Sequence, residues 1–385
     1  GIYMKKMIKL SLVAAVAVAG LTTSATAGSL ENAIKDTTIS GKAMVGYNYS
    51  KVGTTNATNE VEYDIDATIT TKVNDTISFT AGFEADNTTD IDSVFTAATA
   101  ATANGLTTNY APATAASTTT AATTTADVRL TKLYFTAKTD VATVMIGKQK
   151  QPTPFMDDER GDGVVALVPA GPVTIAAGHF TGMNTTLGLT NDITALAAIG
   201  SAGPVNASLW LANISGVADA YSLNLSANVG PVAIDFTHTD VDYDAASTDA
   251  SLSKLIVSGK VANVNLVAGY GMTNDNTVGG RSAGVDVTGD NDAKTNFRLD
   301  QLVLDNLNDA DAILVGASMT FGATTVGANY LMVDLNTAGT SDATELDVNV
   351  KYAMSKNFSI TGLYSDTNDV GGDDTRMELS LNYKF

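Results

Sequence analysis

The densest group of charged residues in the sequence directly follows a stretch that contains two prolines. The group consists of Asp157, Asp158, Glu159, Arg160 and Asp162. Carboxylates gathered at a narrow passage raise the local concentration of cations and disfavour anions. Pro152 and Pro154 stiffen the chain ahead of the group, and Phe155 and Met156 are apolar enough to hold it against a wall. We therefore expect a pore constriction here, with a solvated acidic surface loop as the alternative.

Other charged residues occupy every second position of segments whose intervening residues are apolar. Side chains of a strand point alternately to its two faces, so these charges share one wet face. On this face we expect the pore-lining residues Lys132, Arg376, Lys351, Glu62, Asp64 and Asp66. Basic residues opposite an acidic loop would produce a transverse field that orients polar solutes. For most of these residues, taken singly, an isolated solvated charge is the alternative.

A second acidic segment offers oxygen ligands of the kind that calcium binds. Asp286, Asp290 and Asp292 lie close together within residues 274–308. Carboxylate and amide oxygens can hold calcium, but the spacing is not that of an EF-hand and the closing Glu of that motif is absent. Calcium is one interpretation of this segment, and a plain solvated loop is the other. We expect no other cofactor.

The two histidines do not form a catalytic pair. His179 and His238 each share the strand face of apolar neighbours, whereas a hydrolase needs a serine–histidine pair oriented by a third group. The sequence also lacks a phosphate-binding glycine motif and the histidine spacing of a metal site. The chain is therefore not expected to be an enzyme.

The most regular of the strands that must position these residues ends the chain, at residues 375–385. Its odd positions are apolar and its even positions are polar or charged, and the last residue is Phe385. Such a strand fits an outer-membrane β-barrel, apolar towards lipid and polar towards the lumen. A sandwich strand with its apolar face inward is the alternative.

The rest of the chain favours the barrel. Residues 60, 62, 64 and 66 are all acidic, and a strand face of four carboxylates cannot be a core face. We expect eighteen antiparallel strands, with sixteen as the fallback, joined alternately by short periplasmic turns and longer extracellular loops, as in bacterial transmembrane barrels. Residues 148–163 then form the third outer loop, which we expect to fold into the lumen.

Composition agrees with an exported membrane protein. The formal net charge of −19 argues against binding nucleic acid, which requires clustered basic residues. We expect a start at Met4 and a signal peptide over residues 1–27, because a basic segment precedes an apolar run and a small-residue cleavage site. A short periplasmic segment (28–38) and the barrel domain (39–385) would follow, placed in the outer membrane of a Gram-negative bacterium.

Five short segments resemble the Campylobacter-type major outer membrane porins. They are SLENAIKD at 29–36 with ISG at 39–41, TVMIGKQ at 143–149, DG at 162–163 and YKF at 383–385. The resemblance covers both ends and the third loop, while the Thr/Ala-rich tract at 87–126 departs from it. It implies an eighteen-stranded, trimeric, cation-preferring diffusion porin with calcium as a candidate ligand. It also implies that the membrane-insertion machinery reads the terminal Phe385.

These observations predict a water-filled outer-membrane channel for passive diffusion of small hydrophilic solutes and cations. A barrel that serves as an adhesin or structural surface protein, with a plugged lumen, is the alternative. The expected lumen face is charged and contains Gly46, Gly82 and Gly316 instead of bulky side chains, which favours the open channel.

Overall fold

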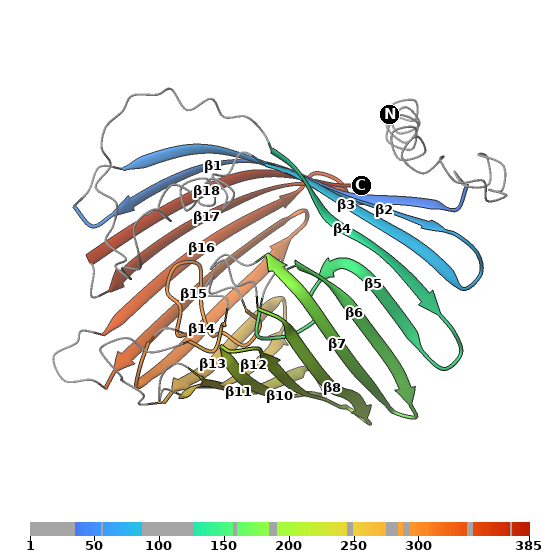
Figure 1. Cartoon of the computed structure of the whole chain (residues 1–385). Coiled ribbons are helices and arrows are strands. Elements are labelled where there is room, and N and C mark those ends of the chain that lie inside the picture. Colours follow the sequence, from blue (N-terminus) through green and yellow to red (C-terminus); the bar gives the residue numbers. More distant parts are fainter. Residues whose placement is uncertain are drawn as a thin grey trace, which may run out of the picture.

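The computed structural model describes residues 35–54, 57–86, 127–156, 160–184, 191–244, 249–274, 284–287, 293–305, 307–336, 342–369 and 372–385. These residues form eighteen antiparallel strands (Figure 1). The first nine are β1 (Thr37–Val52), β2 (Thr58–Lys72), β3 (Ile77–Asp86), β4 (Asp127–Lys138), β5 (Thr143–Lys150), β6 (Arg160–Ala170), β7 (Val173–Asn184), β8 (Ile193–Ala202) and β9 (Val205–Ile214). The last nine are β10 (Ala218–Val229), β11 (Val232–Tyr243), β12 (Asp249–Val261), β13 (Val264–Thr273), β14 (Ala310–Phe321), β15 (Thr324–Leu335), β16 (Ala343–Ala353), β17 (Phe358–Asp369) and β18 (Gly372–Lys384).

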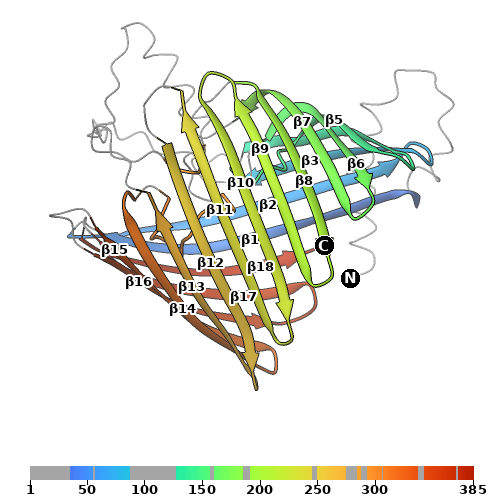
Figure 2. The same cartoon turned by 90° about the horizontal axis from the view of Figure 1, so that it is seen from below.

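The sheet closes on itself, because β1 pairs with both β2 and β18. Figure 2 shows the blue β1 beside the red β18. At this seam Val45 lies opposite Leu381 on one side and Tyr63 on the other. Closure satisfies every strand edge, which a sheet in lipid requires. The predicted barrel of eighteen strands is confirmed, and the short connection at residues 215–217 is one of its outer turns.

No helix among the described residues has both the length and the apolar character needed to cross a membrane.

The two faces of the wall differ as the alternation predicts. Large apolar side chains such as Val45, Val348 and Leu379 are about half exposed in the isolated chain (50%, 46% and 56%) and share the outward parity. The intervening positions carry the charged and hydroxyl side chains of the lumen. The outward band is the surface that a barrel turns to lipid.

The most deeply buried apolar residues lie where two connections pack inside the barrel. Phe155, in the connection from β5 to β6, is completely buried. Phe297 and Leu304, in the connection from β13 to β14, are also buried and belong to the same apolar cluster. The sequence interpretation treated residues 274–308 as a plain outer loop or a calcium loop. In the structure, the described part of this connection packs against the inner wall.

Candidate functional site

The first segment inside the lumen is residues 151–156, which follow β5. Phe155 and Met156 pack in a cluster with Val165 of β6 and Phe180 of β7. Glycine makes room for this packing, because a Cβ on Gly163 would lie only 2.7 Å from Cδ1 of Phe180. Asp157, Asp158 and Glu159, the predicted constriction carboxylates, lie outside the described residues.

The second segment is a small hairpin at residues 297–304. The N–H of Leu304 donates to the carbonyl of Phe297 (2.9 Å), and the N–H of Leu299 donates to that of Leu302 (3.1 Å). The ring of Phe297 lies against β13, where a Cβ on Gly271 would come within 2.7 Å of it. A side chain at position 271 would therefore fill space that the hairpin occupies.

The two segments contact each other within the lumen. The backbone N–H of Val287 donates to the carbonyl of Phe155 (3.4 Å). Val287 belongs to the same connection as the hairpin, and its neighbour Val285 is held by a hydrogen bond from its N–H to Oδ1 of Asp305 (2.6 Å). The two segments thus form one obstruction that spans from β5 and β6 to β13.

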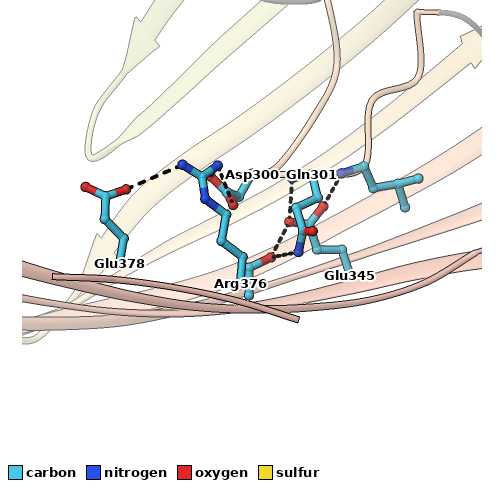
Figure 3. Close-up of polar contacts among 7 residues, drawn as sticks. Asp300, Gln301, Glu345, Arg376 and Glu378 are labelled. Atoms are coloured by element: carbon cyan, nitrogen blue, oxygen red, sulfur yellow. Dashed lines mark hydrogen bonds and ion pairs between the residues drawn. The ribbon is translucent and has the colours of Figure 1, made fainter. Parts of the chain in front are cut away.

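Glu345 of β16 fastens the hairpin to the wall. Its side chain is fully buried, and Oε1 accepts hydrogen bonds from the N–H of Gln301 (2.8 Å) and the hydroxyl of Ser365 (2.8 Å). Oε2 accepts a further bond from the N–H of Leu302. The side chain of Gln301 also donates to Ser365 Oγ (2.9 Å). Figure 3 shows Gln301 reaching Glu345 from the loop.

An ion pair lies beside this anchor. Arg376 of β18 places Nη1 3.2 Å from both carboxylate oxygens of Asp300, and Nη2 lies 3.8 Å from Oε2 of Glu378 (Figure 3). Arg376 was predicted to line the pore, and it reaches into the lumen to hold the hairpin. Burial raises the pKa of the Asp300 carboxyl above its ordinary value, although the Arg376 guanidinium acts in the opposite direction.

This pKa predicts a pH effect on ion selectivity. Asp300 should lose its charge at a higher pH than an exposed aspartate, which removes one of the two carboxylate charges beside Arg376 and lowers any cation preference. The raised pKa also means that protonated Asp300 favours the hairpin in its position against the wall. This contribution to stability is lost as the pH rises from the ordinary pKa of an aspartate through the raised pKa of Asp300. Reversal potentials measured between pH 7 and pH 4 should shift less in Asp300→Asn than in the wild type. Superimposable pH curves for the two proteins would contradict the assignment.

A second anchor comes from β12, on another part of the wall. The ammonium of Lys254 donates to the backbone carbonyls of Lys294 (2.6 Å) and Asn296 (2.7 Å), and the Lys254 side chain is largely buried. A buried ammonium needs such acceptors to replace its water. The β13–β14 connection is therefore held at β12 and at β16–β18.

Four charged side chains gather on the inner wall of β3, β4 and β6. Arg129 pairs with Asp86 and lies 3.6 Å from Oε2 of Glu84. Arg160, at the start of β6, lies 3.5 Å from the same Glu84 oxygen. In the sequence, Arg160 directly follows the acidic residues 157–159, which lie outside the described part of the chain. Two acids and two bases at one level of the wall can act on any ion that passes.

Comparison with known proteins identifies the family to which the chain belongs. A family model described as Gram-negative porin matches residues 11–385. The chain belongs to this porin family. A search of curated protein sequences gave no match.

Solved structures of other outer-membrane channels have the same fold as this porin. Acinetobacter baumannii OccAB4 superposes with a TM-score of 0.68 at 12% identity, covering 91% of this chain and 98% of its own. Pseudomonas aeruginosa OccK8 (OprE) gives 0.69 at 13%, with coverage of 91% and 98%. Pseudomonas aeruginosa OpdK, solved with vanillate, gives 0.65 at 12%, with coverage of 90% and 98%.

Family membership and fold together define the basic activity. The porin forms a channel in the outer membrane through which small solutes diffuse. The family and the fold also indicate a channel rather than an enzyme. His179 and His238 form hydrogen bonds with wall hydroxyls, at Thr194 Oγ1 (2.9 Å) and Ser253 Oγ (2.8 Å).

Arg129 is a lumen residue that the sequence did not reveal. Strict alternation from Lys132 would turn Arg129 towards lipid. In the structure, the β3–β4 register shifts between Gly82 and Phe83, so that Lys132 faces Gly82 while Leu130 faces Phe83. The extra residue, Thr131, forms a β-bulge that reverses the parity of the positions before it. Arg129 therefore points into the porin instead of out of it.

The predicted pore-lining residues occupy the inner face of the porin wall. The Lys132 ammonium donates to Thr68 Oγ1 (3.2 Å), and Asp64 forms an ion pair with Lys42 (2.6 Å). Asp66 lies opposite Glu84 in the β2–β3 ladder, and Glu62 lies opposite Gly46 of β1. Lys351 is exposed on β16, on the face of Glu345 and far along the strand from it. The structure thus collects the acidic residues on β2 and β3 and leaves Lys351 apart from them.

Asp162 does not line the lumen, which corrects the prediction for this residue. Gly161, Gly163 and Val165 face inward, while Asp162 shares the outward parity of Val164 and is exposed. The β6–β7 register shifts beside these residues, where Arg160 lies opposite Asn184 and Asp162 opposite Thr181, so that β7 carries the extra residue.

Asp286 also differs from expectation. It is buried instead of solvated, and its Oδ2 accepts the N–H of Ala293 (3.2 Å). Within the part of the chain that the structure describes, no three His, Cys, Asp or Glu side chains form a group that could hold a metal. Asp290 and Asp292 lie outside that part, so calcium binding by the three residues stays a prediction.

Proposed function

We propose that this porin is a cation-preferring general diffusion channel of the Campylobacter-type major outer membrane porins. One observation carries the selectivity: five carboxylates share the inner face of the adjacent strands β2 and β3. They are Glu62, Asp64, Asp66, Glu84 and Asp86. In the ladder, Asp64 lies opposite Asp86 and Asp66 opposite Glu84. Lys42, Arg129 and Arg160 neutralise part of this charge and leave an acidic excess.

The third outer loop supports the same preference. Arg160 lies 3.5 Å from Oε2 of Glu84, and in the sequence it directly follows three further acidic residues at 157–159. A negative potential on both sides of a narrowed passage concentrates cations and repels anions. The overall charge of −19 acts in the same direction.

The combined substitution Asp157→Asn, Asp158→Asn and Glu159→Gln should lower the cation preference. Reversal potential in a planar bilayer under a KCl gradient is the measurement. Asp75→Asn with Asp140→Asn, in exposed periplasmic turns, is the control and should leave the reversal potential unchanged. An unchanged potential in the triple variant would reject the role of the loop. A barrel that conducts no ions would favour the display alternative, and chloride preference in the wild type would reject cation selectivity.

The proposal includes the assembly of the porin. We infer export through a cleaved signal peptide over residues 1–27, a homotrimer, and recognition of Phe385 by the insertion machinery. The placement of Phe385 supports the last point, because its backbone exchanges hydrogen bonds with Gly41 at the β1–β18 seam (3.0 and 3.1 Å) and its ring stacks on Tyr383. Loss of Phe385 should lower the amount of barrel in isolated outer membranes.

A further inference from the structure

A cavity of about 360 Å³ lies between the inner wall of β9–β12 and the two segments inside the lumen. Ligand pockets in proteins span roughly 300–1,000 Å³, so this one suits a small solute. The charge cluster described above is on β3, β4 and β6, and the cavity shares none of its residues. It is therefore a separate feature of the lumen.

The wall side of the cavity is a row of polar side chains at one level of four strands. Lys254 of β12 lies opposite Thr237 of β11, Thr237 opposite Asn224 of β10, and Asn224 opposite Ser208 of β9. The Asn224 amide donates to Asp235 Oδ1 (3.0 Å) and to Thr237 Oγ1 (2.9 Å). These bonds fix the orientation of the amide and the carboxylate and do not use the amide oxygen.

An aromatic ring lies one step along the same wall. Trp210 of β9 is opposite Ser222 of β10, two residues from Ser208, and it lines the cavity. A large apolar ring beside a few fixed polar groups is the usual composition of a site for a small organic solute. The C–H face of a sugar ring packs well on an indole while its hydroxyls bond to neighbouring polar groups.

The loop side supplies a polar atom without a partner. Pro152 and Pro154 come from the first segment, and Lys294 and Thr295 come from the second. Thr295 is fully buried, and its hydroxyl makes no hydrogen bond to any residue that the structure describes. A buried hydroxyl left unpaired costs free energy, which a ligand hydroxyl in the cavity would recover.

We propose that this cavity binds a neutral, polyhydroxylated solute of monosaccharide size. Its polar groups are hydroxyls, an amide, the Asp235 carboxylate and the Lys254 and Lys294 ammonium groups, and they can match the donors and acceptors of adjacent sugar hydroxyls. The Asp235 carboxylate disfavours an anion, and the ammonium of Lys254 disfavours a cation, so a neutral solute avoids both penalties. The inference rests on the proposed function, because the solute reaches the cavity through the lumen.

Trp210 is the only tryptophan in the sequence, so its fluorescence reports on this cavity. The purified porin in detergent micelles is titrated with glucose, with alanine as a zwitterion and with acetate as an anion. We expect a saturable change in Trp210 emission with glucose alone. Saturation by alanine or acetate without glucose would overturn the proposed solute class, and no saturable change with any solute would overturn the site.

Two variants test the contacts. Asn224→Ala should weaken glucose binding about tenfold, the effect of losing one or two hydrogen bonds. Thr295→Val keeps the shape of the side chain without its hydroxyl and should weaken binding in the same direction. Asn382→Ala is the control, since Asn382 also donates to two wall hydroxyls, at Thr361 and Ser380, and lies on β18. Unchanged affinity in both cavity variants would overturn the proposal, and heat-dependent gel mobility verifies that each barrel is folded.

Ion current separates this inference from the function on which it rests. Glucose should reduce the conductance of the wild type in a planar bilayer, and should do so less in Asn224→Ala. Normal conductance without any glucose effect would overturn the inference and leave the channel intact. Absence of conductance would overturn the channel, and the fluorescence titration in micelles would still decide whether the cavity binds.

Discussion

Replacement of Glu345 by alanine should release the hairpin at residues 297–304 and increase the single-channel conductance of the porin. The buried carboxylate accepts hydrogen bonds from the N–H groups of Gln301 and Leu302 and from the Ser365 hydroxyl. Hydrogen bonds to a charged group contribute roughly 1.5–3 kcal/mol each, and their loss leaves buried N–H groups unpaired. The barrel should persist, because its ladder does not depend on this side chain.

Two measurements test the release of the hairpin. Conductance in a planar bilayer reports the width of the passage, and trypsin cleavage after Lys294 or Arg298 reports whether the connection has left the wall. Glu378→Ala is the matched control, because it removes one lumen carboxylate whose contact with Arg376 is as long as 3.8 Å. If Glu345→Ala keeps wild-type conductance and resists trypsin, the anchor does not hold the hairpin.

Replacement of both Arg129 and Arg160 by glutamine should strongly increase the cation preference. The two guanidinium groups lie against Glu84 and Asp86, so their removal leaves these carboxylates uncompensated. A unit charge acts on an ion about 6 Å away with roughly 0.7 kcal/mol at the dielectric constant of water, which corresponds to about threefold in local ion concentration for each charge removed. Two charges together should therefore change the permeability ratio several-fold.

Reversal potential measured at several KCl concentrations tests this expectation. The effect should shrink at high salt, because screening shortens the range of each charge to about 3 Å at 1 M. Lys72→Gln with Lys138→Gln removes the same charge from the periplasmic ends of β2 and β4 and serves as the control. A double arginine variant that behaves like this control would show that the cluster does not act on the permeating ions.

The barrel could be predicted from sequence because its cause is local. Each strand has one face towards lipid and one towards water. Its side chains therefore alternate in polarity, as Met377, Leu379 and Leu381 do with Arg376 and Glu378. Short turns such as that at residues 171–172 are equally local, since Gly171 adopts a positive φ of 64° there. Strand number and order followed from these two signals.

The charged site could be predicted only in part, because bulges and long-range contacts are not local. The bulge at Thr131 reverses the parity of β4 without any marker in the alternation. The β13–β14 connection did carry a signal, since Phe297, Leu302 and Leu304 are too apolar for a solvated loop. Its anchors could not be inferred, because Glu345 and Arg376 are 44 and 76 residues from their partners Gln301 and Asp300.

The anchoring of the β13–β14 connection has a consequence for the order of assembly. The hairpin is synthesised before β16, β17 and β18, and these strands carry Glu345, Ser365 and Arg376. The hairpin cannot reach its final position until those strands have joined the wall. Docking of the hairpin on Glu345 and Arg376 therefore marks the completion of the wall.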